Sequence, residues 1–204
     1  MCVVSVPMLT MDRTSIARAA RVVLDGGVVA FPTDTVYGLG CNPRDAGAVE
    51  RLFRIKGRER KPVSVLCSDR SKASELVKFS AGALNLAVKY WPGALTIVLP
   101  LRAADLPIQL HQNTGWLGVR VPEHRWCLSF IKRAGGYVTG TSANISGRPS
   151  SRSAQSVLDQ FGDGIDLIID GGTLAETEST VVRIRGRSVE VLRRGGVSLD
   201  SGES

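Results

Sequence analysis

Three short segments of the sequence combine hydroxyl, amide and cationic side chains at spacings that could bind a charged small molecule. The first, residues 31–40, reads Phe-Pro-Thr-Asp-Thr-Val-Tyr-Gly-Leu-Gly and follows a short apolar stretch. Thr33 and Thr35 offer hydroxyls that donate and accept hydrogen bonds, and Tyr37 adds a ring and a phenol. Open sheets bind ligands at the loops that end their strands, so a ligand site is one interpretation. A polar turn without a ligand is the other.

The second segment, residues 54–62, is strongly basic and reads Arg-Ile-Lys-Gly-Arg-Glu-Arg-Lys-Pro. We expect Gly57 to break the preceding helix and to place Lys56 and Arg58 on irregular backbone, where both can converge on one anion. Lysine serves phosphate as a point charge, and arginine adds a planar fork. The alternatives are a solvated basic face and cations that complement a helix dipole.

The third segment, residues 138–147, reads Val-Thr-Gly-Thr-Ser-Ala-Asn-Ile-Ser-Gly. Short hydroxyls at Thr141 and Ser142, together with exposed backbone N–H groups, can form an anion-binding nest. Asn144 could join that nest or cap its own loop. The sequence contains neither G-x-x-x-x-G-K-[ST] nor G-x-G-x-x-G, so a nucleotide would be bound outside those two frameworks.

Three further residues are candidates because of their place in predicted strands. Arg120 stands inside the apolar stretch Gly-Val-Arg-Val-Pro at 118–122. A charge there must be paired or must face a ligand cavity. Ser179 opens a predicted strand and Arg193 closes the last one, and each also has an ordinary surface interpretation.

The elements that must position these segments alternate between helix and strand. This order predicts an α+β fold, with a large twisted mixed sheet flanked by helices and a hairpin at its end. We expect one domain over residues 1–197 and a frayed polar tail at 198–204. An irregular stretch is expected over 103–115. The predicted helices are 16–24, 46–55, 71–78, 81–90, 126–134 and 154–161, and the predicted strands are 28–31, 63–66, 95–99, 117–121, 137–141, 167–169, 180–184 and 188–192.

Composition narrows the class of protein without choosing a ligand. The formal net charge of +7 favours anionic partners such as nucleotides or RNA. No apolar run approaches the ~20 residues of a membrane helix, so we expect a cytoplasmic protein with no membrane partner. The four cysteines are scattered without a C-x-x-C pair, which predicts reduced thiols and no metal site.

Together the segments resemble the YrdC/TsaC family. The matching motifs occur in family order and cover about residues 16–196. The resemblance implies a YrdC-like fold with a concave basic cleft, in its single-domain form. The matches are residues 26–39, Lys-x-Arg at 56 and 58, residues 91–96, 118–120, 141–147 and 179–182, and Leu192-Arg193.

The resemblance also implies an activity, L-threonylcarbamoyladenylate synthesis from ATP, bicarbonate and L-threonine. Pyrophosphate is released, and partner proteins complete the transfer to tRNA, with weak tRNA or RNA binding as a further expectation. Mg²⁺ is expected to arrive with ATP rather than at a protein metal site.

The resemblance assigns each candidate residue a role. Lys56 and Arg58 are implied to be catalytic by stabilising charge on the phosphate and carbamate. The implied ATP-binding residues are Lys56, Arg58, Thr141, Ser142, Asn144 and Arg193. The implied threonine-binding residues are Thr35, Tyr37, Arg120 and Ser179.

Two departures and two alternatives accompany this assignment. Leu66 stands where some relatives have histidine, and Arg194 stands where proline is usual. One alternative is a YrdC-like paralog with another carbamoyl-related activity, such as the module of HypF or a YciO-type protein. The other is a non-catalytic RNA-binding protein, whose affinity would fall steeply with salt and would survive the loss of Asn144.

Overall fold

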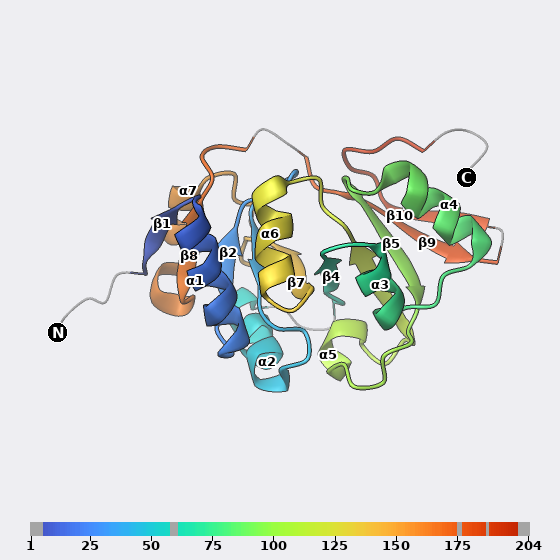
Figure 1. The fold of residues 1–204 in the computed structure, drawn as a ribbon, viewed down its shortest axis with the longest axis horizontal. Helices are drawn as coiled ribbons and strands as arrows, with labels where there is room; N and C mark the ends of the chain where they lie inside the picture. The colour runs from blue at the N-terminus through green and yellow to red at the C-terminus, as the bar shows by residue number, and fades with distance from the viewer. Residues whose placement is uncertain (1–5, 58–60, 175–176, 187, 200–204) are drawn as a thin grey trace.

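The computed structural model describes residues 6–57, 61–174, 177–186 and 188–199, and within them ten strands form one mixed sheet. The strand order is β1-β8-β2-β3-β7-β4-β6-β5-β9-β10. Figure 1 shows this sheet running along the long axis, from β1 and β8 at one end to β9 and β10 at the other. The strands are β1 Met8–Thr10, β2 Val29–Phe31, β3 Gly38–Gly40, β4 Ser64–Cys67, β5 Leu95–Pro100, β6 Trp116–Arg120, β7 Tyr137–Ser142, β8 Leu167–Asp170, β9 Thr180–Arg185 and β10 Ser188–Arg193.

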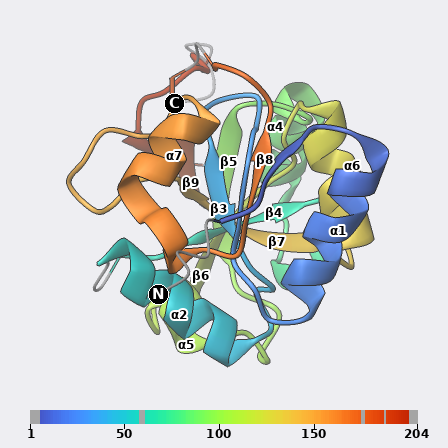
Figure 2. The same cartoon turned by 90° about the vertical axis from the view of Figure 1, so that its left-hand side faces the viewer.

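Helices cover both sides of the sheet at its β8–β2 end, with α1 and α6 on one side and α2 and α7 on the other (Figure 2). One apolar cluster joins α1 and α6 to the sheet through Ile16, Phe31 and Phe130. A larger cluster joins the remaining helices to the other sheet surfaces. The predicted fold class is therefore confirmed. The helices are α1 Arg13–Leu24, α2 Ala46–Lys56, α3 Arg70–Leu76, α4 Ala81–Tyr90, α5 Ile108–His111, α6 Arg125–Arg133 and α7 Ala154–Phe161.

Local sequence explains where most of these helices begin and end. A side chain before the first turn accepts a backbone N–H and so satisfies a donor that the helix cannot. Gly57 ends α2 in the left-handed conformation, with φ at 56°, and its N–H returns to the carbonyls of the last turn. The capping side chains are Asp12, Asp45, Asp69, Ser80, His124 and Ser153.

Every predicted helix and strand is present within a few residues, but four elements were not expected, one of them the short 3₁₀ helix at Gly162–Gly164 that follows α7. Strand β3 lies in the segment predicted to be a loop, and it pairs with both β2 and β7. A Cβ on Gly40 would lie 2.2 Å from Val138 Cγ1, so this position needs glycine for close packing. Because glycine has a low intrinsic strand propensity, the sequence of Gly38–Gly40 does not predict β3. Strand β1 and helix α5, which lies inside 103–115, are the remaining two.

The chain ends are only partly described. Of the predicted tail, Ser198 and Leu199 are described, and Leu199 packs against the larger apolar cluster. Residues 200–204 lie outside the described part. Within the described segments, no helix combines the length and apolar character needed to cross a membrane.

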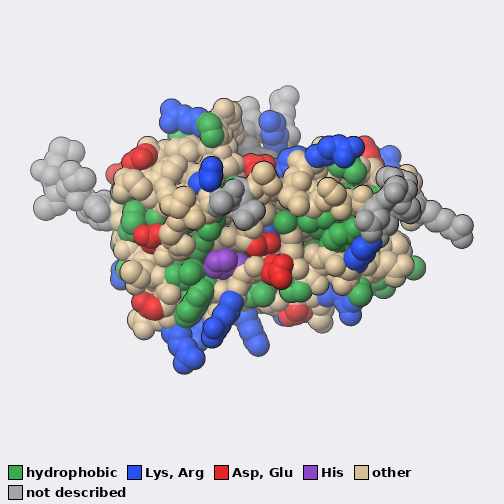
Figure 3. Space-filling model, turned by 90° about the horizontal axis from the view of Figure 1, so that it is seen from above, with side chains coloured by type: hydrophobic (Ala, Val, Ile, Leu, Met, Phe, Trp, Pro, Cys, Tyr) green, Lys and Arg blue, Asp and Glu red, His purple; other side chains and the backbone are tan. Residues whose placement is uncertain are grey.

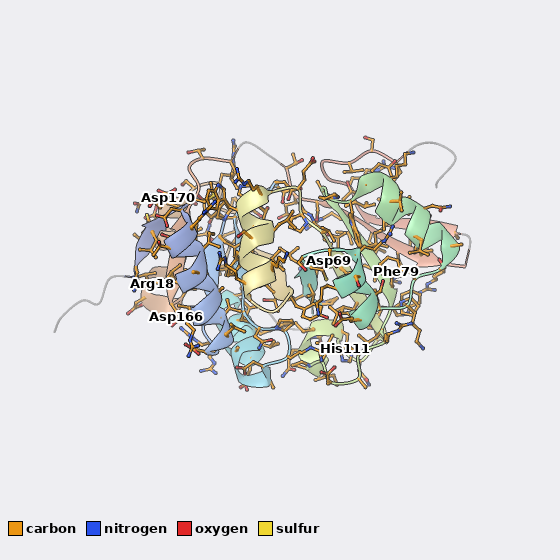
Figure 4. All side chains as sticks on the ribbon, viewed as in Figure 1. Arg18, Asp69, Phe79, His111, Asp166 and Asp170 are labelled. Carbon is orange, nitrogen blue, oxygen red and sulfur yellow. The ribbon has the colours of Figure 1, made fainter. Side chains whose placement is uncertain are left out.

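One ion pair ties helix α2 to the segments that lead into strands β8 and β2. Arg51 on α2 donates to both carboxylate oxygens of Asp166, at 2.5 and 3.0 Å, and to the carbonyl of Gly164. Asp166 also accepts the N–H of Val28 at 2.7 Å, next to β2. Figure 4 labels Asp166 at one end of β8 and Asp170 at the other. Loss of the carboxylate charge therefore weakens contacts to two elements together.

We expect Asp166→Asn to lower the free energy of unfolding by about 1–2 kcal/mol, since charge-assisted hydrogen bonds are lost. Asp25→Asn is the matched control, because Asp25 forms an exposed i,i+4 pair with Arg21 and should cost under about 0.5 kcal/mol. Urea unfolding followed by circular dichroism measures both. Equal losses in the two variants would contradict this account of the fold.

His124 makes the stability depend on pH. Its Nδ1 accepts the N–H of Cys127 at 3.1 Å, which requires an unprotonated nitrogen, and burial lowers the pKa of His124. Above the unfolded pKa of about 6.5 the neutral form is present in both states. Below it the unfolded chain binds the proton first, so the stabilisation is lost as pH falls through the lower folded pKa.

We therefore expect wild-type stability to fall between pH 7 and pH 5 by more than that of His124→Asn. Asparagine keeps a capping acceptor and does not titrate in this range. Thermal melts at several pH values compare the two slopes. Parallel slopes would show that His124 contributes nothing to the pH dependence.

Candidate active site

A cavity of about 270 Å³ opens over one surface of the sheet, above β4, β5, β6, β7 and β9. Residues two apart on a strand face the same side, and strand register aligns them across the sheet. Thus Ser64 pairs with Gly140, and Val98 lies between Gly118 and Arg183. A Cβ at Gly118 would lie 2.7 Å from Ser64 Oγ. The glycines therefore keep the floor low enough to leave the cavity open.

Arg120 is a buried charged group in this floor. Its side chain is buried, with the residue only 5% exposed. Nε donates to the carbonyl of Gly93 at 2.9 Å, Nη1 to Thr35 Oγ1 at 3.2 Å and Nη2 to Asp34 Oδ1 at 2.5 Å. The prediction that this arginine is paired or faces a cavity is confirmed in both respects. Asp34 was not singled out, although its place between two threonines was the available signal.

The threonine hydroxyls at the cavity wall are held in a fixed arrangement. Thr33 Oγ1 donates to the carbonyl of Val36 at 2.7 Å and lies 2.9 Å from Thr35 Oγ1. Thr35 in turn accepts from Arg120, so its hydroxyl is oriented by the floor. Both threonines line the cavity. The first predicted segment therefore contributes hydroxyls to a cavity wall.

Tyr37 lines the same cavity but commits its phenol elsewhere. The hydroxyl donates to the carbonyl of Gly172 at 2.8 Å and accepts the N–H of Gly171 at 2.9 Å. Burial raises the pKa of Tyr37. The phenol therefore ties the segment before β3 to the end of β8, near the Asp170 that Figure 4 labels.

Lys56, Ser142 and Asn144 meet beside the cavity. Lys56 is 1% exposed, and its Nζ donates to the carbonyls of Ser142 at 2.5 Å and Asn144 at 2.7 Å. Ser142 Oγ donates to Asn144 Oδ1 at 2.6 Å. Lys56 is the last residue of α2, so the expectation of irregular backbone was wrong for it: Gly57 takes the cap position instead. Arg58 lies outside the described residues.

Asn144 also organises its own loop, as the capping alternative predicted. Its Nδ2 donates to the carbonyls of Arg148 at 2.6 Å and Ile145 at 3.2 Å. Thr141 and Ser142, the preceding residues, line the cavity. The backbone N–H groups of residues 143–146, however, all donate to acceptors within the protein. The expectation of an anion-binding nest with exposed N–H groups was therefore wrong for these residues, and the loop is a rigid support with Lys56 bound to it.

Arg193 and Ser179 build one rim of the cavity. Arg193 donates through Nε and Nη2 to the carbonyl of Ser179, at 3.1 and 2.9 Å, and through Nη2 to Ser179 Oγ at 3.0 Å. Its Nη1 pairs with the carboxylate of Glu178. Ser179 Oγ lies 3.0 Å from Thr96 Oγ1 on β5. Ser179, Thr96 and Arg193 all line the cavity.

Trp116 and Arg183 are among the cavity residues that were missed from the sequence. Trp116 lines the cavity four residues before Arg120, so their even spacing on β6 was the signal. The guanidinium carbons of Arg183 and Arg185 lie 5.9 and 5.7 Å from its ring centroid, within cation–π range. This end of the cavity is therefore aromatic and basic.

The three cysteines in the described part of the chain do not line this cavity. Cys41, Cys67 and Cys127 are buried free thiols, as predicted. Burial raises the pKa of the Cys41 thiol to about 12, so it stays protonated at neutral pH. Among the described residues, no group of three or more His, Cys, Asp or Glu side chains is placed to hold a metal ion. The polar side chains that line this cavity include the arginines at 120, 183 and 193, several hydroxyls and the carboxylate of Glu178.

Comparison with known proteins gives this cavity a family context. The Sua5_yciO_yrdC family model, which carries the description "Telomere recombination", matches residues 21–195. Threonylcarbamoyl-AMP synthase of Bacillus subtilis is 35% identical over 96% of this chain and 58% of its own length. Its namesake in Nitrosococcus oceani is 34% identical over 86% of this chain and 95% of its own length. The chain thus spans a little over half of the Bacillus relative.

Solved structures share the fold. Crystalline Pyrococcus abyssi Sua5 complexed with L-threonine superimposes with a TM-score of 0.90 at 36% identity, over 97% of this chain and 59% of that one. Escherichia coli YciO superimposes with a TM-score of 0.85 at 27% identity, over 95% and 97% of the two chains. Because the family model covers residues 21–195, and relatives above 30% identity match most of the sequence, this chain belongs to the Sua5/YciO/YrdC family.

Proposed function

We propose that this chain synthesises threonylcarbamoyl-AMP from ATP, bicarbonate and L-threonine. The observation that carries the proposal is one cavity bordered by Thr35, Arg120 and Ser179 and also by Ser142 and Arg193. The first three suit an amino acid and the last two suit a phosphate. Relatives at about 35% identity that bear the name of this enzyme support the same conclusion.

The reaction needs positioning and charge stabilisation more than a protein nucleophile. The threonine amine attacks bicarbonate, and water leaves to give a carbamate. A carbamate oxygen then attacks the α-phosphorus of ATP, and the bond to the bridging oxygen breaks as pyrophosphate departs. Fixed hydrogen-bond donors that face the developing charge lower such a barrier, and holding the reactants together supplies much of the rest.

Arg120, Thr35 and Ser179 are the residues we assign to the amino acid. Arg120 is already held by Asp34 and Gly93, so a threonine carboxylate would meet a guanidinium fixed in one orientation. A planar guanidinium suits a carboxylate better than a lysine would. Leu66 adds an apolar surface where some relatives were expected to have histidine. Tyr37 supports this wall through its tie to Gly172.

The phosphates are assigned to the opposite wall and rim. Ser142, Thr141 and Arg193 line the cavity, whereas Lys56 and Asn144 support the loop from beneath. Arg58 keeps its predicted role as a second catalytic cation. We propose that Mg²⁺ enters with ATP and stays on its phosphate oxygens, where it would neutralise charge on pyrophosphate.

The site suits a small ligand better than a stretch of RNA. Its volume of about 270 Å³ is near the lower end for small-molecule sites, which run from roughly 300 to 1,000 Å³. On the face seen in Figure 3, Lys and Arg side chains are interspersed with Asp and Glu. We propose that partner proteins carry the product to tRNA, and that the cytoplasm, where ATP and tRNA meet, is the site of action.

Purified protein incubated with ATP, Mg²⁺, labelled bicarbonate and L-threonine should release pyrophosphate only when threonine is present. A labelled adenylate should accumulate in equal amount, because each turnover makes one of each product. Pyrophosphate release and chromatography of the nucleotide measure them separately. Folded protein that yields neither product would rule out this function.

Lys56→Ala and Arg58→Ala should each slow the reaction at least about tenfold, or 1.4 kcal/mol of barrier. Loss of the Lys56 ammonium removes its hydrogen bonds to the part-buried carbonyls of Ser142 and Asn144 and releases the loop of these two residues. Lys132→Ala, exposed on α6, is the control and should leave the rate unchanged. Steady-state rates at saturating substrates compare the three, and wild-type rates in both site variants would show that the anion site is misplaced.

A further inference from the structure

The carboxylate of Glu178 occupies a position at the cavity rim that is built for an anion. One oxygen accepts a hydrogen bond from Ser150 Oγ at 2.5 Å, and the other pairs with the guanidinium of Arg193. Ser150 belongs to the segment between β7 and α7, whereas Arg193 ends β10. A cation and a hydroxyl from distant parts of the chain therefore converge on one pair of oxygens.

A phosphate group would make the same demands on these donors. Its oxygens accept from a guanidinium fork and from a hydroxyl, as a carboxylate does. The Nε and Nη2 donors of Arg193 are directed at Ser179, so Nη1, which faces Glu178, is the nitrogen that an incoming anion would use. Two negative groups cannot share that side without repulsion. A phosphate bound to Arg193 must therefore take the place of the Glu178 carboxylate.

The backbone around Glu178 is fixed, so its side chain alone can move. The carbonyl of Glu178 accepts the N–H of Gly196 at 3.0 Å. A Cβ at Gly195 would lie 2.2 Å from that carbonyl oxygen, which shows how closely the two segments pack. The side chain of Glu178 remains 33% exposed and that of Arg193 remains 45% exposed. Rotation of the Glu178 side chain into solvent would free the guanidinium without disturbing the strands.

We propose that Glu178 is an internal competitor that holds the phosphate position at Arg193 and Ser150 until a nucleotide phosphate displaces it. The identity of that phosphate as ATP rests on the proposed function, but the exchange itself rests only on this geometry. Glu178 weakens the binding of anions at the rim and most of all the binding of those held by charge alone, such as pyrophosphate. It also keeps Arg193 oriented while the site is empty of nucleotide.

Glu178→Gln tests the exchange, because glutamine keeps the length and the acceptor for Ser150 but removes the charge. Calorimetric titration with inorganic pyrophosphate at constant ionic strength should show at least about fivefold tighter binding than wild type. Binding of L-threonine should stay within about twofold. Glu50→Gln is the matched control: it makes the same change of net charge at an exposed position on α2 and should leave pyrophosphate affinity within about twofold.

The double variant Glu178→Gln/Arg193→Gln gives a second, independent readout. If the carboxylate competes for Arg193, the Glu178 substitution should no longer tighten pyrophosphate binding once Arg193 is absent. Unchanged or weaker pyrophosphate binding in Glu178→Gln, in protein with wild-type circular dichroism, would overturn the proposal. So would equal tightening with and without Arg193, or no pyrophosphate binding by any variant.

These outcomes are separate from those of the proposed function, since pyrophosphate binding requires no turnover. Tighter binding in Glu178→Gln without threonine-dependent pyrophosphate release by wild type would leave the exchange in place and remove the enzyme activity. Threonine-dependent turnover by wild type, together with unchanged pyrophosphate affinity in Glu178→Gln, would support the enzyme activity and remove the exchange.

Discussion

The pairing of Arg120 with Asp34 is the interaction on which the cavity depends. A guanidinium in the floor of a sheet is stable only if its charge and its N–H groups are satisfied. Asp34 supplies the charge, while Thr35 and the carbonyl of Gly93 supply acceptors. These partners come from the segment before β3 and the turn before β5. The same contacts that make the buried charge tolerable therefore also position one wall of the site.

Lys56 is a second buried cation whose charge and N–H groups must also be satisfied by protein acceptors. Its ammonium is satisfied by the backbone carbonyls of Ser142 and Asn144, so the end of α2 and the loop after β7 are fixed to each other. Removing either cation would remove a charge together with the hydrogen bonds that join two segments of the chain. Positioning and electrostatics in this protein thus depend on the same few hydrogen bonds.

Between these two walls the sheet supplies an open floor. Gly118 and Gly140 face the cavity at positions where the neighbouring strands present Ser64 and Leu66. Larger residues would fill the space that a ligand needs. Trp116 and Arg183 contribute an aromatic and basic part of the lining. Arg193 and Glu178 contribute another part, at the rim. The cavity therefore has distinct apolar, cationic and hydroxyl-rich parts.

The sequence by itself determined the main helices and strands, because apolar periodicity, capping side chains and Gly57 act over a few neighbouring residues. It also indicated the three polar segments and the unusual arginine at 120. Only the tertiary structure decided that Gly38–Gly40 is a strand, since the close approach of Val138 and Phe31 is invisible to local propensity. Likewise, Lys56 binds the carbonyl of Ser142, 86 residues away, and the Tyr37 hydroxyl binds the carbonyl of Gly172, 135 residues away. Arg193 binds Glu178 and Ser179, which lie 15 and 14 residues before it. Pairing across such separations is set by strand order and register, which no short stretch of sequence specifies.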